Sequence, residues 1–146
     1  MVSQRTVGEQ GNLGRLELPD DNTAPGLARS HTRAVLGRWS LPGVLEPLLL
    51  VVSELVSNAV RHGRPPVGLW LRRVGRGVRV DVHDESSEFD AGRAGDSVRR
   101  DLDAEGGRGL SLIDALSVDH GVDQILHDGK HVWAVVEPEA EASVLV

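Results

Sequence analysis

The chain has no cysteine and no tyrosine, and aromatic residues make up only 3% of its 146 residues. The lack of cysteine excludes disulfides, thiolate metal ligands and thiol nucleophiles. With so few aromatic rings, we expect no stacking platform for single-stranded nucleic acid, and the core has to consist of Val, Leu and Ala. A net charge of -6 also argues against a direct nucleic-acid partner, which needs a basic surface.

The sequence also lacks long apolar runs and a targeting signal. Its first twelve residues are polar and do not contain the apolar stretch of a secretory signal. The longest apolar run, Leu48–Val52, falls far short of the roughly 20 residues needed to cross a bilayer. We therefore expect a cytoplasmic protein that does not bind a membrane.

The length suits one domain, expected over residues 13–137 between a flexible N-terminal tail (1–12) and a C-terminal tail (138–146). Alternating apolar and polar residues predict strands over 13–18, 67–73, 77–83, 122–126 and 131–137. Apolar residues at helical spacing predict helices over 25–39, 44–62 and 109–117. The stretch between 84 and 107 follows neither pattern and is expected to be a functional lid or disordered. This order of elements predicts an α+β two-layer sandwich, with antiparallel hairpins and helices on one face of the sheet.

Each of the first two predicted helices has an apolar side. In the first helix this side is expected to consist of Leu27, Val35, Leu36 and Trp39. In the second helix it is expected to consist of Leu48, Val51, Val52, Leu55, Val56 and Ala59. Both sides would pack against the core.

Two polar residues interrupt the second helix. Glu54 and Asn58 are one turn apart, so both project from the same side, and Arg61 and His62 continue this polar stripe to the helix end. Carboxylate and amide oxygens suit a divalent cation, and a carboxylate can also act as a general base. The alternative is that Glu54 and Asn58 lie on the solvated face of an ordinary helix.

Two further motifs follow the second helix. Asp84 ends a predicted strand. A buried carboxylate at this position can accept a hydrogen bond from an exocyclic amine such as that of adenine. The alternative is that Asp84 only forms the turn after the strand. The glycine-rich residues 105–110 lead directly into the third helix. Their backbone N–H groups and the helix N-terminus would form an anion site. The alternative is that this glycine-rich segment is a flexible hinge. The pattern matches neither a P-loop nor a Rossmann fingerprint. The segment Gly129-Lys130-His131 is a tight turn into the last strand.

In this order, SELVSNAVRHG (53–63), Asp84, GGRGLSLIDAL (106–116) and the last turn resemble the Bergerat-fold, or GHKL, ATP-binding superfamily. That superfamily includes histidine-kinase catalytic domains, gyrase B subunits and mismatch-repair ATPases. Within it, the chain is similar to the small bacterial anti-sigma-factor serine/threonine kinases of the single-domain actinobacterial branch. The resemblance covers about residues 16–137 and implies a mixed, mainly antiparallel sheet with helices on one face.

The resemblance implies a role for each matching residue. Glu54 corresponds to the general base, Asn58 to the magnesium ligand at the nucleotide, and His62 to the residue that ends the first motif. Asp84 corresponds to the aspartate that holds the adenine amine. The cofactors implied are ATP and Mg2+. The phosphate-side glycine box corresponds to Gly107, Arg108, Gly109 and Leu110.

The implied function is an ATP-binding serine/threonine protein kinase that phosphorylates an anti-sigma-factor antagonist and regulates a sigma factor by partner switching. The partners are therefore proteins, and a homodimer is left open. The alternative is an ATP-gated protein-binding module with little or no kinase activity. A protein-binding domain that has lost nucleotide is disfavoured, because it would have no use for Glu54, Asn58 and Asp84 together.

The sequence also departs from the superfamily pattern. Glu85, Ser86 and Ser87 follow Asp84 where many members have glycines, although small actinobacterial members commonly lack those glycines too. His131 occupies the position of a threonine that often helps to seat adenine. A phosphoacceptor histidine region is missing, which argues against a two-component histidine kinase.

Overall fold

The computed structural model describes residues 12–86, 108–125 and 128–139. The helices in this part of the chain are α2 (Ala24–Trp39), a 3-10 turn η1 (Pro42–Val44), α3 (Leu45–His62) and α5 (Arg108–Leu116). The strands are β1 (Asn12–Leu18), β2 (Val67–Val74), β3 (Gly77–Asp84), β4 (Asp119–Gln124) and β5 (Lys130–Val136). The predicted elements are confirmed, most of them to within a residue or two, and β4 shows the largest shift because it begins three residues earlier than expected.

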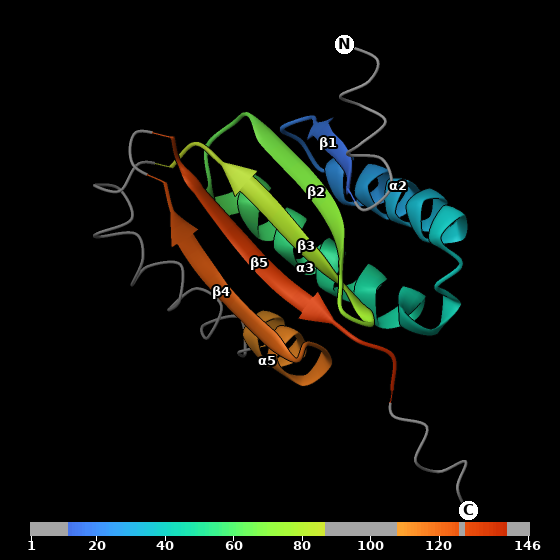
Figure 1. Cartoon of the computed structure of the whole chain (residues 1–146). Coiled ribbons are helices and arrows are strands. Elements are labelled where there is room, and N and C mark those ends of the chain that lie inside the picture. Colours follow the sequence, from blue (N-terminus) through green and yellow to red (C-terminus); the bar gives the residue numbers. More distant parts are fainter. Residues whose placement is uncertain (1–11, 87–107, 126–127, 140–146) are drawn as a thin grey trace, which may run out of the picture.

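The strands form one five-stranded sheet in the order β1-β2-β3-β5-β4, and α2, α3 and α5 lie on one side of it (Figure 1). This arrangement confirms the predicted α+β two-layer sandwich. All four strand pairings in the described sheet are antiparallel, in agreement with the expected mainly antiparallel sheet. The central position of β3 places its C-terminal end, at Asp84, in the interior of the fold.

Helix α2 begins after Thr23, whose backbone N–H donates to the Asp21 carboxylate at 2.8 Å. The expected inclusion of Leu27 in its apolar side is wrong, because that side chain is 49% exposed. The buried side of α2 contains Ala28 in place of the expected Leu27. It also contains the polar residue Thr32, whose hydroxyl is satisfied because it donates to the Ala28 carbonyl oxygen at 2.8 Å. The buried residues of α2 are Ala24, Ala28, Thr32, Val35, Leu36 and Trp39.

Helix α3 is the central helix of the fold and lies against the sheet between α2 and α5 (Figure 1). All six residues predicted to form its apolar side are buried, which confirms that prediction. By length and composition alone the segment Pro42–His62, with a mean hydropathy of 1.5, passes for a membrane span. Its apolar residues instead pack on the sheet and on α2, as in the core helix of a globular domain.

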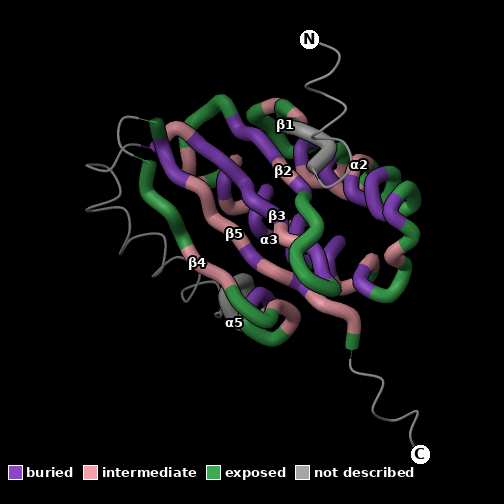
Figure 2. Tube along the Cα trace, viewed as in Figure 1, coloured by how far each residue is buried: buried purple, intermediate pink, exposed green. Residues whose placement is uncertain are grey.

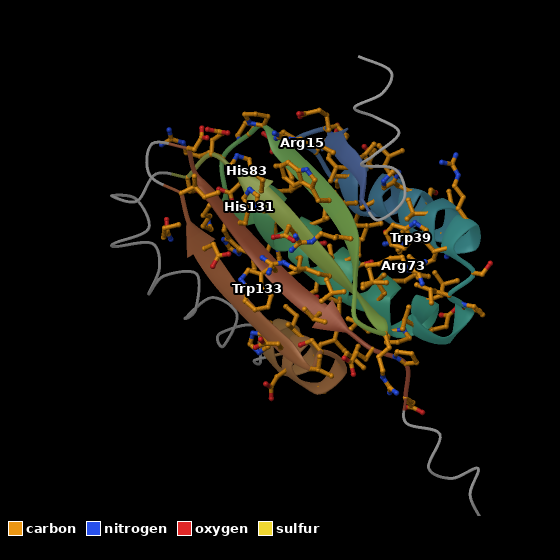
Figure 3. The ribbon with its side chains drawn as sticks, in the orientation of Figure 1. Arg15, Trp39, Arg73, His83, His131 and Trp133 are labelled. Atoms are coloured by element: carbon orange, nitrogen blue, oxygen red, sulfur yellow. The ribbon has the colours of Figure 1, made fainter. Side chains whose placement is uncertain are left out.

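The two faces of the sheet differ in chemistry because side chains alternate along each strand. The inner face is apolar and is buried under the helices (Figure 2). The outer face has a layer of arginine, tryptophan and histidine side chains, several of which are visible in Figure 3. Arg15 lies 4.8 Å from the Trp70 ring centre, and Trp70 stacks on His131 at 5.0 Å.

A second arginine covers the other tryptophan of this outer layer. The Arg79 guanidinium lies 4.3 Å from the Trp133 ring centre and forms an ion pair with Asp81 at 2.8 Å. The hydrogen bond from Arg79 to the Asp81 carboxylate raises the pKa of Arg79, whereas burial acts in the opposite direction. The two tryptophans therefore stack on groups of this chain itself.

Two leucines of α3 provide a matched test of this architecture. Leu48→Ala should lower the free energy of unfolding by about 2–5 kcal/mol, because Leu48 is fully buried and its truncation leaves a cavity. Leu50→Ala, two positions along the same helix and 50% exposed, should change it by less than about 0.5 kcal/mol. Urea denaturation measures both values, and equal losses would contradict the assignment of the buried face.

Candidate functional site

The C-terminal ends of α3 and β3 meet at one place in the fold. Helix α3 stops at Gly63, whose N–H donates to the Ala59 carbonyl oxygen at 2.9 Å. Just beyond it, the N–H of Glu85 donates to the Arg64 carbonyl oxygen at 2.8 Å and ties the end of β3 to the end of the helix. A Cβ on Gly63 would lie 2.5 Å from Asp84 Cγ, so this position requires glycine.

Asp84 is the buried carboxylate at this meeting point, with 1% of its surface exposed. Its Oδ1 accepts hydrogen bonds from the backbone N–H groups of Ser86 at 2.8 Å and Arg64 at 3.4 Å. Its Oδ2 lies 3.1 Å from Lys130 Nζ. Asp84 therefore forms a turn, as one of the two interpretations expects, and its carboxylate is buried. The hydrogen bond from an exocyclic amine stays a prediction.

Glu54 and Asn58 lie half-buried on α3, two turns and one turn, respectively, before His62 at its end. Among residues 12–86, 108–125 and 128–139, no hydrogen bond or ion pair to the Glu54 carboxylate is found. The Asn58 side-chain oxygen accepts a hydrogen bond from Arg61 Nη2 at 3.2 Å. The polar stripe thus runs along α3 toward Gly63, next to which Asp84 is held.

The glycine box is described only in part. Gly107 and most of the expected lid lie outside the described residues. The backbone of Arg108, Gly109 and Leu110 forms the first turn of α5, so the prediction that a helix opens directly after the glycines is confirmed. Helix α5 packs on the core through Ile113, which is buried, and through Leu116.

A magnesium ion would bind here with few protein ligands. In the described part of the chain, no three His, Asp or Glu side chains converge to hold a metal. Mg2+ is commonly held in nucleotide sites by one or two protein oxygens together with phosphate oxygens and water. The half-buried amide oxygen of Asn58 fits that role, provided that Arg61 releases it.

Lys130 is a site residue that the sequence alone did not indicate. By itself the turn that contains it predicts a hairpin, and the family resemblance that includes this turn implies no role for Lys130. In the β3–β5 register Lys130 lies directly opposite Asp84, and its side chain is buried against that carboxylate. The preceding Gly129 has a φ of 81°, and a Cβ there would lie 2.1 Å from the Asp84 carbonyl oxygen. The one available signal was that Lys130 is the single lysine of the chain.

His131, at the position of the frequent threonine, lies outside this site. Alternation along β5 directs its side chain to the outer face of the sheet, where it stacks on Trp70 and lies 3.5 Å from the Asp81 carboxylate. His83 is on the same outer face, with its Nε2 2.7 Å from a Glu85 carboxylate oxygen (Figure 3). Asp84 and Lys130 are therefore the inward-facing residues at these strand ends.

Close packing between Gly63 and Asp84 gives a testable prediction. Gly63→Ala should destabilise the protein by about 1–3 kcal/mol, because the added methyl group overlaps the carboxylate and the Ala59 carbonyl oxygen. As a control, Gly37→Ala meets no atom within 4 Å and should stabilise α2 by about 0.5 kcal/mol. Urea denaturation of both variants is the measurement, and a Gly63→Ala protein as stable as the wild type would contradict this packing.

Comparison with known families accounts for this arrangement. The family model described as a histidine kinase-like ATPase domain matches residues 18–136, a range that includes Glu54, Asn58, Asp84 and residues 107–110. The search of curated proteins finds no match. Because the family match extends from the end of β1 to the end of β5, the chain belongs to the histidine kinase-like ATPase family, of the GHKL type.

Proposed function

We propose that this protein is an ATP-dependent serine/threonine protein kinase of the bacterial anti-sigma-factor type. Its family supports ATP binding, usually with Mg2+, and a kinase or regulatory role. The observation that carries the proposal is the buried Asp84 carboxylate, packed against the end of the helix that bears Glu54 and Asn58. In this proposal the protein acts in the cytoplasm, phosphorylates a protein antagonist and binds a sigma factor by partner switching, as a monomer or a homodimer.

The chemistry of the site residues supports these roles. Within the described residues, Asp84 Oδ2 has Lys130 as its only partner, and it can accept a further hydrogen bond, as from the adenine amine. Asn58 offers a hard oxygen to Mg2+, and the first turn of α5 offers backbone N–H groups to the phosphates. ATP supplies the phosphoryl group that is transferred, and Mg2+ neutralises part of its charge.

Glu54 is the residue best suited to move a proton. Its carboxylate is half-exposed and has no partner in the described part of the chain, so it can accept a proton without first breaking an ion pair. In the proposed reaction it takes the proton of a serine or threonine hydroxyl. The hydroxyl oxygen forms a bond to the γ-phosphorus while the bond from that phosphorus to the ADP oxygen breaks.

A second candidate function is an ATP-gated protein-binding module that transfers little or no phosphate. The hydrogen bond from Arg61 to the Asn58 oxygen favours this candidate, because it occupies the atom that would bind Mg2+. Nucleotide binding would then change which partner the protein binds rather than drive chemistry. Phosphoryl transfer to a protein partner distinguishes the two candidates.

Nucleotide binding is the first expected outcome. Calorimetry should detect Mg-ATP binding, and Asp84→Asn should weaken it roughly 10–100-fold, the span expected for a lost hydrogen bond to a charged group. Asn58→Ala should weaken only the magnesium-dependent part of the affinity. Asp119→Asn, an exposed change on β4, serves as the control and should leave the affinity unchanged. Absence of ATP and ADP binding at millimolar concentrations would contradict the proposal.

Catalysis is tested by Glu54→Gln, which keeps the shape of the side chain and removes its basicity. ATP affinity should stay within a few-fold, while phosphoryl transfer to the partner falls by roughly 10²–10⁴, the usual contribution of one general base. Glu46→Gln, an exposed change in the first turn of the same helix, should transfer at the wild-type rate.

The readout is transfer of radiolabel from ATP to a protein partner captured with the wild-type chain. Equal rates for wild type and Glu54→Gln would remove Glu54 from the mechanism. Tight ATP binding with no transfer by either protein would favour the gated binding module.

A further inference from the structure

We propose that Leu50 is a docking residue for the protein substrate, and that it binds an apolar side chain next to the serine or threonine that receives the phosphoryl group. This inference rests on the proposed function, because it places the substrate relative to ATP and Glu54. It adds the chemistry by which the substrate is recognised. Leu50 belongs to none of the motifs discussed above, and its role follows from its place on α3.

The polar stripe of α3 continues through Leu50 with the same spacing. Four residues of this helix are four positions apart and therefore follow one another along one side of it: Leu50, Glu54, Asn58 and His62. The C-terminal end of the stripe lies next to Asp84. Leu50 is therefore at the end of the stripe away from Asp84, about 6 Å of helix rise from Glu54.

The proposed function assigns a different group to each part of this stripe. The base of ATP is at Asp84, the metal is at Asn58, and the acceptor hydroxyl is at Glu54. The nucleotide thus occupies the stripe from its C-terminal end up to Glu54. The part of the stripe that stays open to a protein bringing a hydroxyl group to Glu54 is the turn with Leu50. Side chains one helical turn apart have Cβ atoms about 5–6 Å from each other, so Leu50 is within reach of the residues that flank the acceptor.

Leu50 is exposed although its neighbours on both sides are buried. Its side chain is 50% exposed, whereas those of Leu49 and Val51 face the core. It is the only large apolar residue of α3 that is exposed. Covering it with an apolar side chain of the substrate removes the remaining surface from water, which favours the complex. A charged side chain at the same place in the substrate would lose its hydration without gaining a partner.

Leu27 on α2 provides a matched comparison, because it is a leucine with 49% of its surface exposed. Two positions further along α2, Arg29 reaches α3, where its Nη1 donates to Ser53 Oγ at 3.0 Å. Residues two positions apart on a helix point about 200° away from each other. Leu27 therefore points away from α3 and from Glu54. Exposed leucines are common on protein surfaces, so the position of Leu50 beside Glu54, and not its exposure, carries the inference.

Steady-state kinetics test the inference, with the partner protein captured by the wild-type chain and then purified as the substrate. Leu50→Ala should raise the KM for this partner roughly 3–10-fold, because about half of a leucine side chain is no longer covered in the complex. Both kcat and the affinity for Mg-ATP should stay within about twofold, since the groups that carry out the transfer are unchanged. Leu50→Asp should raise the KM further, and Leu27→Ala should leave it unchanged.

The other outcomes overturn the inference in distinguishable ways. A wild-type KM for both Leu50→Ala and Leu50→Asp would overturn it while leaving the proposed kinase intact. A fall in kcat at unchanged KM would also overturn it, because it would indicate a role in the transfer step. A phosphorylated serine or threonine with only charged neighbours, mapped by mass spectrometry, would contradict the proposed substrate chemistry. If the partner binds without transfer, the dissociation constant replaces KM in the same comparison. Absence of ATP binding would overturn both proposals.

The lack of cysteine allows a second test that does not depend on transfer. Leu50→Cys introduces a single thiol, which can be labelled with an environment-sensitive fluorophore such as acrylodan. The purified partner should shift its emission to shorter wavelength, and Mg-ATP alone should not. Leu27→Cys with the same label should respond to neither. A label at position 50 that prevents the complex, when one at position 27 does not, would equally support the inference.

Three results of the labelling experiment would overturn the inference. The first is an unchanged emission at position 50 while size-exclusion chromatography shows the complex with the partner. The second is a shift caused by Mg-ATP alone, which would place the nucleotide on this turn of α3. The third is a shift that appears when the labelled protein is concentrated on its own, which would assign this surface to a second copy of the chain.

Discussion

The contact between the Asp84 carboxylate and the end of α3 is the one on which the rest of the site depends. The carboxylate accepts a hydrogen bond from the Arg64 N–H, packs against Gly63, and pairs with Lys130 on the neighbouring strand. It thereby connects the helix that bears Glu54 and Asn58 to two strands of the sheet. The same contacts hold the buried Asp84 carboxylate in one orientation.

Alternation along the strands decides which residues belong to the site. Val78, Val80 and Val82 face the helices, so the next inward residue on β3 is Asp84, and its neighbour His83 faces outward. The same rule separates Lys130 from His131 on β5. The outward residues form their own layer with Trp70 and the arginines, on the face of the sheet opposite the helices.

Much of this arrangement follows from the sequence, because the spacing of apolar residues along a helix or strand indicates which of its side chains are buried. The helical spacing of α3 predicts its buried side, and the interruptions at Glu54 and Asn58 predict the polar stripe. The error at Leu27 arises because the apolar stripe of α2 is built from alanines and a threonine, which carry a weak hydrophobic signal. Lys130 is separated from Asp84 by 46 positions, and its partner becomes evident only from the pairing register of β3 and β5. The roles of Glu54 and Asn58 came from resemblance to a family, since spacing alone does not distinguish a solvated face from a metal site.

The central claim is that ATP binds where Asp84, Gly63 and Lys130 meet. Amide NMR during a titration with Mg-ATP tests it most directly, because the backbone N–H groups of Arg64 and Ser86 donate to the carboxylate that would hold the base. The account predicts that these two amides shift in a saturable manner while Arg76, in the distant β2–β3 turn, does not. Shifts that instead gather on the outer face, around Trp70 and His131, with Arg64 and Ser86 unchanged, would contradict it.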